Sequence, residues 1–565
     1  MSGRSTSFEI QFLRDKHWVV AEIKGDEEQA KAFADNLLQK GDHEAVRVVR
    51  DFARMDGLHA ETIILEKTGG PPKVDLSLAQ VAEAPVCGEL NDFYGLDSRI
   101  TIGRMCRKYL DEMVLTPTEL LHSAQELRRF GDKDRLLGSG IDAVATLQAR
   151  ATGDESKVRR DFLHAQWEKI TARARAATAA LKPAADKSFA AIVKSLPAAE
   201  GPERDYLCGL QMARRLLETR SWLGKLDILI AWAAEDAEDA FAYRMIDGVI
   251  ADIVVSAQMV QDLLGFQSNL GTALCHICDL VAGQAEAAKF SPPCFAPLNS
   301  LFAAERLPQT GRVLLTRVTR EIRGPNPLSR NEPRQEYEMF HKVMHRLIRL
   351  DQVIGGPAAA EALVHRYAHL SNLSGGSVPI QAMSGVLTAL SDQCRRVHFL
   401  LGLVCSTLAA TVKGALFEAL ANGVRGADHI DAWVSLRVAP RDRMAALTAT
   451  NASLLATEPV AEPERKALAN CVDEALARYL VDEGIIEKID KADDPLAMRA
   501  IRLIKFCGSG VLIRGKSMEL ARQRVIGHLR QPQFEEKFLA SVPDPAQGEK
   551  YLRDFHRLLV EVGFG

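Results

Sequence analysis

The feature that most constrains the fold is a long stretch with helical spacing, residues 377–422. In its first half, apolar residues recur every three or four positions, which is the period of one helix face. These residues are Ile380, Met383, Val386, Leu387, Leu390, Cys394 and Val397. The second half, 397–412, is apolar nearly all round, which is typical of a helix enclosed by other helices. We therefore expect residues 377–422 to form a central helix surrounded by further helices.

Composition and helix signals predict that most of the remaining chain is also helical. Aromatic residues make up only 6% of the 565 residues, which favours helix over sheet. Thr116-Pro117-Thr118-Glu119 combines a capping hydroxyl, a proline in the first helical position and a glutamate three residues after the cap. An alanine-rich, strongly charged composition predicts a helix at 154–183. Further helices are predicted at 203–220, 222–233, 236–263, 269–284, 335–354, 357–371, 439–455, 462–481, 494–506, 517–530 and 547–561. No repeat of fixed period is present, so we expect an irregular helical array or bundle.

The first 68 residues have a different pattern. FEIQFL and HWVVAEI read as two strands around Arg14-Asp15-Lys16, and DEEQAKAFADNLLQKG reads as a helix. AVRVVRDF and ETIILEK read as two further strands. The pattern predicts a small α+β domain of ββαββ order. Such a domain is either a cap on the helical body or a module that binds a partner through an edge or its open face.

Breaks in the pattern divide the chain into four predicted parts. Residues 1–68 form the α+β domain, and 69–85 form a linker that starts at a Gly-Gly-Pro-Pro run. Residues 86–426 form a helical body, and 427–565 form a C-terminal helical block with a basic patch. The fold class is therefore mainly α, with a small N-terminal α+β domain.

Charge, cysteine usage and hydropathy limit the compartment and the partners. The net charge of −3 provides no global field for nucleic acid or acidic membranes. The ten cysteines show no disulfide framework, which indicates a reducing compartment. The N-terminus has no apolar core of signal-peptide length. The longest uncharged run, 397–412, is shorter than the roughly 20 residues of a membrane span. We expect a cytoplasmic protein without a membrane span.

One segment matches the spacing of a nucleotide phosphate loop. Residues 510–517, GVLIRGKS, place two glycines around four residues and then a lysine and a serine. A phosphate loop needs a strand before it and a parallel sheet around it. Residues 494–506 read as a helix, and the 48 residues that follow Ser517 are helical in pattern. We therefore interpret the segment as a connection between two helices.

The same region carries a concentration of positive charge. Between residues 499 and 530 there are eight lysines and arginines and one acidic residue. The patch is either a solvated or internally neutralised surface, or a binding site for an acidic partner or a phosphate-bearing ligand. Nucleic acid is not expected, because aromatic residues for base stacking are sparse here. The candidate anion-binding residues are Arg499, Arg502, Lys505, Arg514, Lys516, Arg522 and Arg524.

Two sets of possible metal ligands also stand out. His341 and His345, and likewise His365 and His369, lie one helical turn apart, so two such helices offer four nitrogens to a metal. Neighbouring arginines would oppose a cation. Cys275 and Cys278 form a lone Cys-x-x-Cys pair, which is at most half of a zinc site, and its apolar surroundings indicate a mid-helix position.

The sequence thus contains no coherent catalytic set, and we assign no catalytic, cofactor-binding or metal-ligating residue. The favoured hypothesis is a non-enzymatic cytoplasmic scaffold or regulatory adaptor that binds protein partners through helical surfaces and the N-terminal domain. The first alternative is a helical metal-binding protein or metalloenzyme that uses His341, His345, His365 and His369. The second alternative is a protein that binds an anionic ligand at the basic patch.

Overall fold

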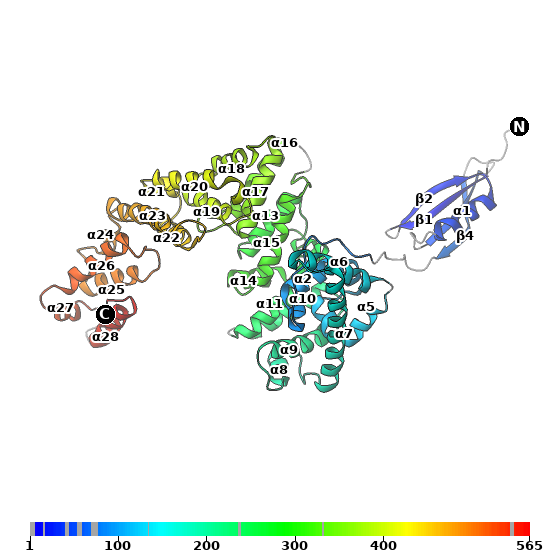
Figure 1. The fold of residues 1–565 in the computed structure, drawn as a ribbon, viewed down its shortest axis with the longest axis horizontal. Helices are drawn as coiled ribbons and strands as arrows, with labels where there is room; N and C mark the ends of the chain where they lie inside the picture. Colours follow the sequence, from blue (N-terminus) through cyan, green and yellow to red (C-terminus); the bar gives the residue numbers. More distant parts are fainter. Residues whose placement is uncertain are drawn as a thin grey trace. The chain divides into compact units, whose positions relative to one another are not determined.

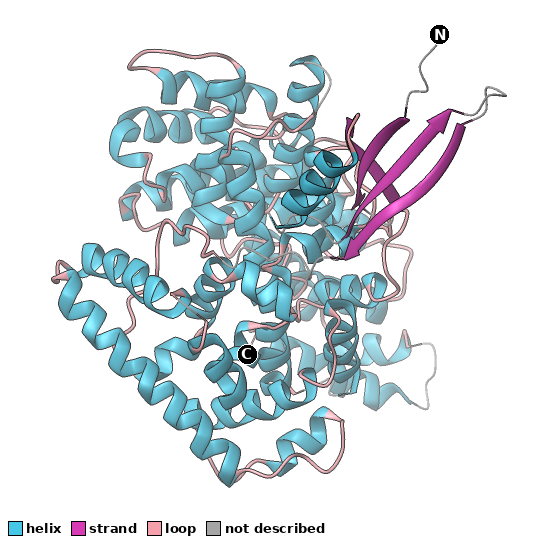
Figure 2. Cartoon of the chain, turned by 90° about the vertical axis from the view of Figure 1, so that its right-hand side faces the viewer, coloured by secondary structure: helices cyan, strands magenta, loops and turns pink. Residues whose placement is uncertain are grey.

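The protein is mainly α-helical, as its sequence predicts. The computed structural model describes residues 6–14, 17–39, 45–53, 59–68, 77–133, 135–235, 239–329, 333–542 and 547–564. Among the described residues the chain is 68% helical, with 28 α-helices, and the first of these lies within the N-terminal domain that holds the four-stranded sheet. Figure 2 shows the sheet at one place only, in the N-terminal domain. This confirms a mainly α fold preceded by a small α+β domain.

The N-terminal domain contains the expected ββαββ elements. They are β1 (Thr6–Arg14), β2 (His17–Lys24), α1 (Glu27–Gln39), β3 (Ala45–Ala53) and β4 (His59–Thr68). The sheet is antiparallel in the order β2-β1-β3-β4 (Figure 1). Asp15 and Lys16 of the expected turn lie outside the described residues. The hairpin of β1 and β2 is confirmed by their direct pairing.

Helix α1 covers one face of this sheet. Phe8 and Ile10 of β1 and Val48 of β3 pack with Ala30 and Ala34 of α1 in one buried cluster. The small alanines let the helix approach the strands closely, and burial of the large apolar side chains drives the contact. Among the described residues of this domain, no helix covers the opposite face of the sheet, so that face is left open.

The chain divides into two compact units. The first comprises Met1–Glu83, Met105–Met113 and Phe130–Arg160, and the second comprises Ala84–Arg104, Val114–Arg129 and Asp161–Gly565. Of the predicted linker, residues 69–76 lie outside the described part, and 77–85 contain no helix or strand. The predicted boundary near residue 427 stays a prediction.

The helices of residues 84–303 contain most of the residues of the internal sites. They begin with a short 3₁₀ helix, η1 (Leu90–Tyr94), followed by α2 (Leu96–Met105), α3 (Arg107–Met113), α4 (Pro117–His122), α5 (Ala124–Gly131), α6 (Leu136–Thr152), α7 (Ser156–Ala180), α8 (Phe189–Ser195), α9 (Gly201–Leu216), α10 (Trp222–Glu235), α11 (Ala240–Val254), α12 (Ala257–Leu264), α13 (Leu270–Val281) and α14 (Phe295–Ala303).

The remaining helices continue the same architecture to the end of the chain. They are α15 (Pro308–Arg323), α16 (Pro333–Leu347), α17 (Gly356–Leu370), α18 (Val378–Ala389), α19 (Gln393–Val404), α20 (Ala409–Arg425), α21 (Ile430–Trp433), α22 (Pro440–Ala456), α23 (Glu462–Asp482), α24 (Ile485–Ile489), α25 (Leu496–Cys507), α26 (Lys516–Leu529), α27 (Phe534–Ala540) and α28 (Gly548–Glu561). Consecutive helices such as α19 and α20, α22 and α23, and α25 and α26 pack against each other. One hydrophobic cluster connects them from Ile100 to Phe555. This is the arrangement of a helical array.

The prediction of one continuous central helix is wrong. Residues 377–422 form three helices, α18, α19 and α20, instead of one. The first break lies at Leu390, whose backbone is extended, and Asp392 then begins α19. The second break lies at residues 405–408. At the first break the Asp392 carboxylate accepts from the distant Ser435 amide at 3.0 Å, and at the second the Ser406 hydroxyl donates to the Leu403 carbonyl at 2.8 Å. These polar side chains compete with helical backbone hydrogen bonds, which the continuous apolar pattern does not show. The enclosure is correct, since α19 is buried on most sides.

A similar break divides the predicted helix at 236–263. Residues 236–238 lie outside the described part, and the rest forms α11 and α12, separated at Ser256. The Ser256 hydroxyl accepts a hydrogen bond from the Met259 amide and so caps α12. Among the described residues, no helix combines the length and the apolar character needed to cross a membrane.

The predicted helix start at Thr116 is confirmed and is part of a buried ion pair. The Thr116 hydroxyl accepts from the Glu119 amide, and the Glu119 carboxylate accepts from the Thr116 amide at 2.8 Å. The same carboxylate accepts from Lys225 Nζ at 2.6 and 2.7 Å, and both side chains are fully buried. Burial raises the pKa of Glu119 and lowers that of Lys225, while each charge favours the ionised form of the other. This pair anchors α4 against α10.

Candidate functional site

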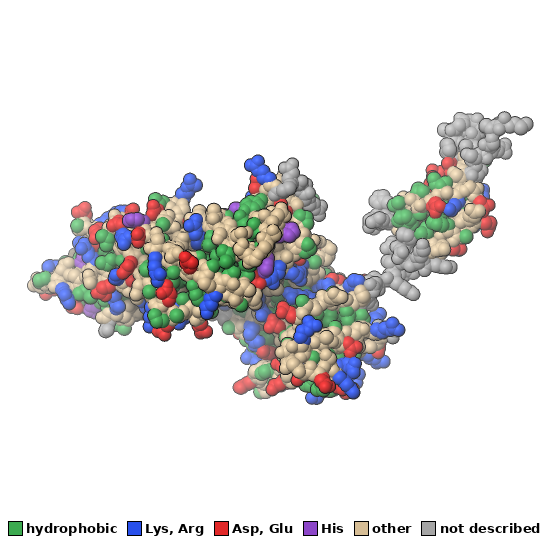
Figure 3. All heavy atoms as spheres, turned by 45° about the horizontal axis from the view of Figure 1, so that its top comes forward, with side chains coloured by type: hydrophobic (Ala, Val, Ile, Leu, Met, Phe, Trp, Pro, Cys, Tyr) green, Lys and Arg blue, Asp and Glu red, His purple; other side chains and the backbone are tan. Residues whose placement is uncertain are grey.

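The open face of the N-terminal sheet carries exposed apolar side chains in two cross-strand rows. The first row consists of Ile23, Glu9, Val49 and Ile63, and the second of Val20, Gln11, Arg47 and Glu66. The exposed fractions of Val20, Ile23 and Ile63 are 46%, 57% and 50%. Hydrophobic side chains also reach the surface of this domain in Figure 3. An exposed apolar patch with a polar rim is typical of an interaction surface.

The rim of this open sheet face is acidic. Glu61 and Glu66 on β4 are exposed and form no ion pair with a described residue. Arg47 is the basic side chain within the two rows, and it is held in place. Its Nε donates to Gln11 Oε1 at 2.8 Å, and its guanidinium lies 4.4 Å from the centroid of the Trp18 ring. The face therefore presents an apolar centre beside free carboxylates.

The phosphate-loop-like segment is a helix connection, as predicted. Helix α25 precedes it, and Gly515 caps α26. Asp473 from α23 occupies the helix start, because its carboxylate accepts from the amides of Lys516 and Ser517 and from the Ser517 hydroxyl at 2.7 Å. A Cβ at Gly515 would lie 2.1 Å from Asp473 Oδ2. The glycine is thus required by the approach of an internal carboxylate, and the helix dipole is already matched by this anion.

Much of the charge of the basic patch is paired within the protein. Arg499 Nε donates to Asp490 Oδ1 at 2.7 Å, and Arg524 Nε donates to Asp490 Oδ2. Other members pair with Asp494 (Arg502, 2.5 Å), with Glu474 (Lys516) and with the Gly563 carbonyl (Arg522). Lys505 and Arg514 are exposed and form no ion pair with a described residue. Basic and acidic side chains are interspersed on the face of the helical body shown in Figure 3.

The four candidate histidines do not form one cluster. Among the described residues, no three His, Cys, Asp or Glu side chains gather closely enough to hold a metal ion. The rings of His341 and His345 are 6.5 Å apart. His365 Nε2 lies 3.5 Å from Glu361 Oε1 instead, and His369 is exposed.

The paired cysteines lie in the middle of a helix, as their surroundings indicate. Cys275 and Cys278 are both buried on α13. Burial raises the pKa of Cys275 to about 11 and that of Cys278 to about 12. Such thiols stay protonated near neutral pH and are poor nucleophiles and poor metal ligands.

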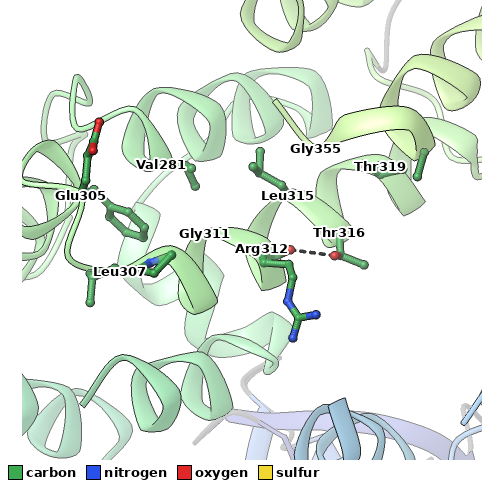
Figure 4. A pocket seen from close by; sticks show the side chains of 12 residues that line it. Val281, Glu305, Leu307, Gly311, Arg312, Leu315, Thr316, Thr319 and Gly355 are labelled. Carbon is green, nitrogen blue, oxygen red and sulfur yellow. Dashed lines mark hydrogen bonds between the residues drawn. The ribbon is translucent and has the colours of Figure 1, made fainter. Parts of the chain in front are cut away.

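An apolar groove of about 470 Å³ lies along α15 (Figure 4). Val281, Leu307 and Leu315 line it, and Arg312 extends away from Val281 and Leu315 in the view of Figure 4. Arg312 Nη2 pairs with Asp97 Oδ1 at 2.8 Å. The groove therefore has apolar walls, and this rim cation is already paired.

A second, more polar cavity of about 410 Å³ lies among η1, α4, α9 and α11 and the start of α15. We call it the Arg99 cavity, and it is defined by Tyr94, Arg99, His122, Tyr206 and Gln309. Helix α4 packs against α9 and α11, which brings these residues together from five separate segments. The charged and hydroxyl groups of this cavity are connected to a buried aspartate behind it.

That aspartate, Asp252 on α11, holds one side of the Arg99 cavity in place. Asp252 is fully buried, and its Oδ2 accepts from Arg99 Nη1 at 2.9 Å, from the Thr118 hydroxyl at 2.6 Å and from the Thr118 amide at 3.0 Å. Burial raises the pKa of Asp252, and the Arg99 charge and the Thr118 hydrogen bonds oppose this rise. The network fixes Arg99 relative to the start of α4.

His122, Tyr206 and Tyr94 form the aromatic wall of the Arg99 cavity. The His122 and Tyr206 rings are stacked with centroids 4.8 Å apart, and the Tyr94 ring meets Tyr206 edge-on at 4.9 Å. The Arg173 guanidinium lies 3.8 Å from the Tyr206 ring centroid. Burial, together with the Arg99 and Arg173 charges, lowers the pKa of His122 to about 3, so its ring is neutral. His122 Nδ1 lies 2.7 Å from the Thr118 carbonyl and is therefore the protonated nitrogen.

Sequence reasoning did not find the Arg99 cavity. Its residues are single polar side chains on separate helices, and no local spacing connects them. The one available signal was the Thr116–Glu119 helix start, which positions Thr118 and His122. The chain matches no protein-family model, and neither the curated proteins nor the solved structures include a significantly similar one. We therefore infer function from the residues of this chain alone.

Proposed function

We propose that the protein is a non-enzymatic scaffold or adaptor of the cytoplasm that binds a protein partner through the open sheet face of its N-terminal domain. The observation that carries this proposal is the pair of apolar rows with Val20, Ile23 and Ile63 exposed. A single helix covers only one face of a four-stranded sheet, so the apolar side chains of the other face need another partner. The helical body supplies further surface for additional partners.

The chemistry of the open sheet face selects the kind of partner. Burial of the apolar rows supplies binding free energy of roughly 25 cal/mol for each Å² removed from water. The free carboxylates of Glu61 and Glu66 favour lysines or arginines on the rim of the partner, which increase the association rate and the specificity. We therefore propose a partner surface with an apolar centre and a basic rim.

The cysteines support the proposed compartment. All ten are free thiols, and eight of them are buried. A buried thiol packs as a small hydrophobic side chain and needs no oxidising environment. A reducing compartment such as the cytoplasm suits this usage.

The test is a comparative purification of the full chain at native expression level. The double variant Ile23→Glu with Ile63→Glu places two charges in the centre of the open sheet face. The control, Val158→Glu with Val560→Glu, changes two valines that are 61% and 69% exposed elsewhere. We expect the same proteins to co-purify with the wild type and the control and to be lost from the sheet variant, whose circular dichroism stays unchanged.

Direct contact is checked with a photo-crosslinking residue at position 63. The crosslinked protein must be one of those lost from the sheet variant, and its capture must weaken with salt, because the acidic rim is screened. Partners that co-purify equally with the sheet variant contradict the proposal. A purified chain that stays alone and turns over a metabolite also contradicts it.

A second candidate function rests on Lys505 and Arg514, which are exposed and without an ion pair to a described residue. These two cations keep an anionic ligand or an acidic partner as a candidate for the basic patch, even though other members are paired.

A further inference from the structure

We propose that the Arg99 cavity binds a small organic molecule through a carboxylate group. The proposal is independent of the open sheet face and adds a ligand to a body whose proposed role is structural. It rests on the concentration of buried polar atoms without a partner around one cavity, on the orientation of the Arg99 guanidinium, and on the charges that act at the cavity wall.

The first observation is unmet hydrogen bonding. Arg99 Nε and Asp252 Oδ1 are buried from solvent and have no hydrogen-bond partner among the described residues, and Tyr94 Oη and Tyr206 Oη, also buried, meet no partner there at full hydrogen-bond geometry. Tyr206 is 2% exposed and Arg99 is 8% exposed. A buried polar atom without a partner destabilises the fold, so their concentration around one cavity is unfavourable. A ligand that accepts hydrogen bonds would remove part of this cost.

The second observation is the way Arg99 is held. Nη1 is used by Asp252 Oδ2 and by the Thr118 hydroxyl at 2.5 Å. Nε and Nη2, which together form the side-on edge of a guanidinium, have no partner among the described residues. This edge presents two parallel N–H donors and matches the two oxygens of a carboxylate. Arg99 is therefore fixed at one end, and its other edge is unpartnered among the described residues.

The third observation is the space in front of this edge. A Cβ at Gly248 would lie 2.9 Å from Arg99 Nη2 and 3.6 Å from Gln309 Oε1. Glycine at this position keeps the Nη2 side of the guanidinium clear. Gly209 has the same role for the ring wall, since a Cβ there would lie 2.7 Å from His122 Nε2. The cavity of about 410 Å³ is in the size range of small-molecule sites.

The charge balance favours a monoanion over a phosphate. The charges that act on His122, at the cavity wall, are those of Arg99 and Arg173. Each of these guanidiniums has one acidic partner, Asp252 and Glu203 respectively. The lining also holds the Arg244–Asp205 ion pair and the Asp92 carboxylate. Because these cations are already paired, net charge opposes a dianion, and a single carboxylate has to bind through the directed donors of Arg99.

The test uses three carboxylates of increasing size, namely benzoate, phenylacetate and 2-naphthoate. Each is compared with its primary amide and with inorganic phosphate at constant ionic strength. Binding to the full chain is measured by isothermal titration calorimetry and by the shift in Tm. We expect saturable binding of at least one carboxylate, with its amide and phosphate weaker by about tenfold or more, which equals about 1.4 kcal/mol.

Two variants locate the site without depending on Arg99 alone. Met245 lines the cavity and is half-buried, so Met245→Trp fills the space while Arg99 and Asp252 stay in place. Arg99→Lys keeps the charge but loses the side-on edge. Arg437→Lys, at an exposed position away from the cavity, is the matched control. We expect the first two variants to weaken carboxylate binding by about tenfold or more and the control to bind like the wild type.

Three results overturn the proposal. None of the carboxylates binds the wild type, or the amides bind equally well, or Met245→Trp binds with unchanged affinity. If Arg99→Lys fails to fold, Met245→Trp and the amide comparison decide the outcome. Enzymatic turnover is not part of the readout, so the result is distinguishable from any outcome for the open sheet face.

Discussion

Two buried aspartates show how differently this protein treats the same side chain. Asp490, which is 3% exposed, has both oxygens engaged, with Arg499 and His528 on Oδ1 and Arg524 on Oδ2. Asp252 is fully buried as well, but its Oδ1 has no partner. Burial opposes ionisation at Asp490, yet the three donors outweigh it and lower its pKa to about 2. At Asp252, burial dominates and the pKa is raised.

The difference shows which charged groups have hydrogen-bonding atoms without a partner in the protein. The basic patch is conspicuous in the sequence, but several of its cations neutralise acidic residues of the same chain. The Arg99 cavity has no conspicuous sequence pattern, but its guanidinium has a free donor edge. An abundance of charge in the sequence is therefore a poor guide to available charge, and the following changes test this contrast.

The largest expected effect is the loss of the Asp490 carboxylate. Asp490→Ala leaves two guanidiniums and the buried His528 without their shared acceptor, and breaking such a buried ion cluster costs about 3–5 kcal/mol. The measurement is the free energy of unfolding in urea, followed by helical circular dichroism. Asp494→Ala removes the acidic partner of Arg502, which is more exposed than Asp490. We expect this change to cost about 0–1 kcal/mol. Equal losses of unfolding free energy in Asp490→Ala and Asp494→Ala would contradict the special role of the buried carboxylate.

A smaller effect is expected where a carboxylate approaches a helix start. In Gly515→Ala the new methyl group collides with Asp473, since its Cβ would lie 2.1 Å from Oδ2. Forced overpacking of this kind costs about 1–3 kcal/mol. The backbone φ of Gly515 is −171°, so the cost comes from the collision and not from backbone strain. Gly414→Ala, at a helical site with open space, is the control. Unchanged stability in Gly515→Ala would show that Asp473 is not held there.

These cases define what the sequence was able to predict. Helix α4 was predictable because its capping box is local, and α7 because its alanine-rich sequence has high helix propensity. The break at Ser391-Asp392 was missed because the apolar pattern continues across it. The Arg99 cavity was missed because Arg99, His122 and Tyr206 converge only through the packing of α2, α4 and α9. Internal neutralisation of the basic patch was one of the two interpretations, but Asp490 was missed as the shared partner of Arg499 and Arg524, because it lies at the C-terminal end of α24 and meets them only through packing.

The two aspartates also predict opposite responses to pH. At Asp490 the folded pKa is about 2, below the ordinary value of 3.8, so its stabilisation is present above pH 3.8 and is lost as the pH falls toward 2. At Asp252 the folded pKa is raised above 3.8. The folded state then binds the proton more tightly, and stability falls as the pH rises through the interval between 3.8 and the raised value.

Asp252→Asn tests this sign directly. The amide oxygen still accepts from Thr118, so we expect a loss of only about 1 kcal/mol near neutral pH. The difference in unfolding free energy between wild type and Asp252→Asn should grow as the pH falls toward 3.8. The difference for Asp490→Asn should be constant above about pH 4 and shrink below it. Parallel pH profiles for the two variants contradict the opposite shifts.

The smallest expected effect on stability concerns the cations that the fold leaves exposed. Lys505 and Arg514 are exposed and form no ion pair with a described residue. Lys505→Ala with Arg514→Ala should therefore change the unfolding free energy by no more than about 0.5 kcal/mol. If the basic patch binds anions, the same variant should elute from a heparin column at clearly lower salt than the wild type, because fewer counterions are released. Arg499→Ala should do the reverse and destabilise the fold with little change in elution, since its charge already serves Asp490. Equal elution of the wild type and the double variant would remove anion binding from the functions of this patch.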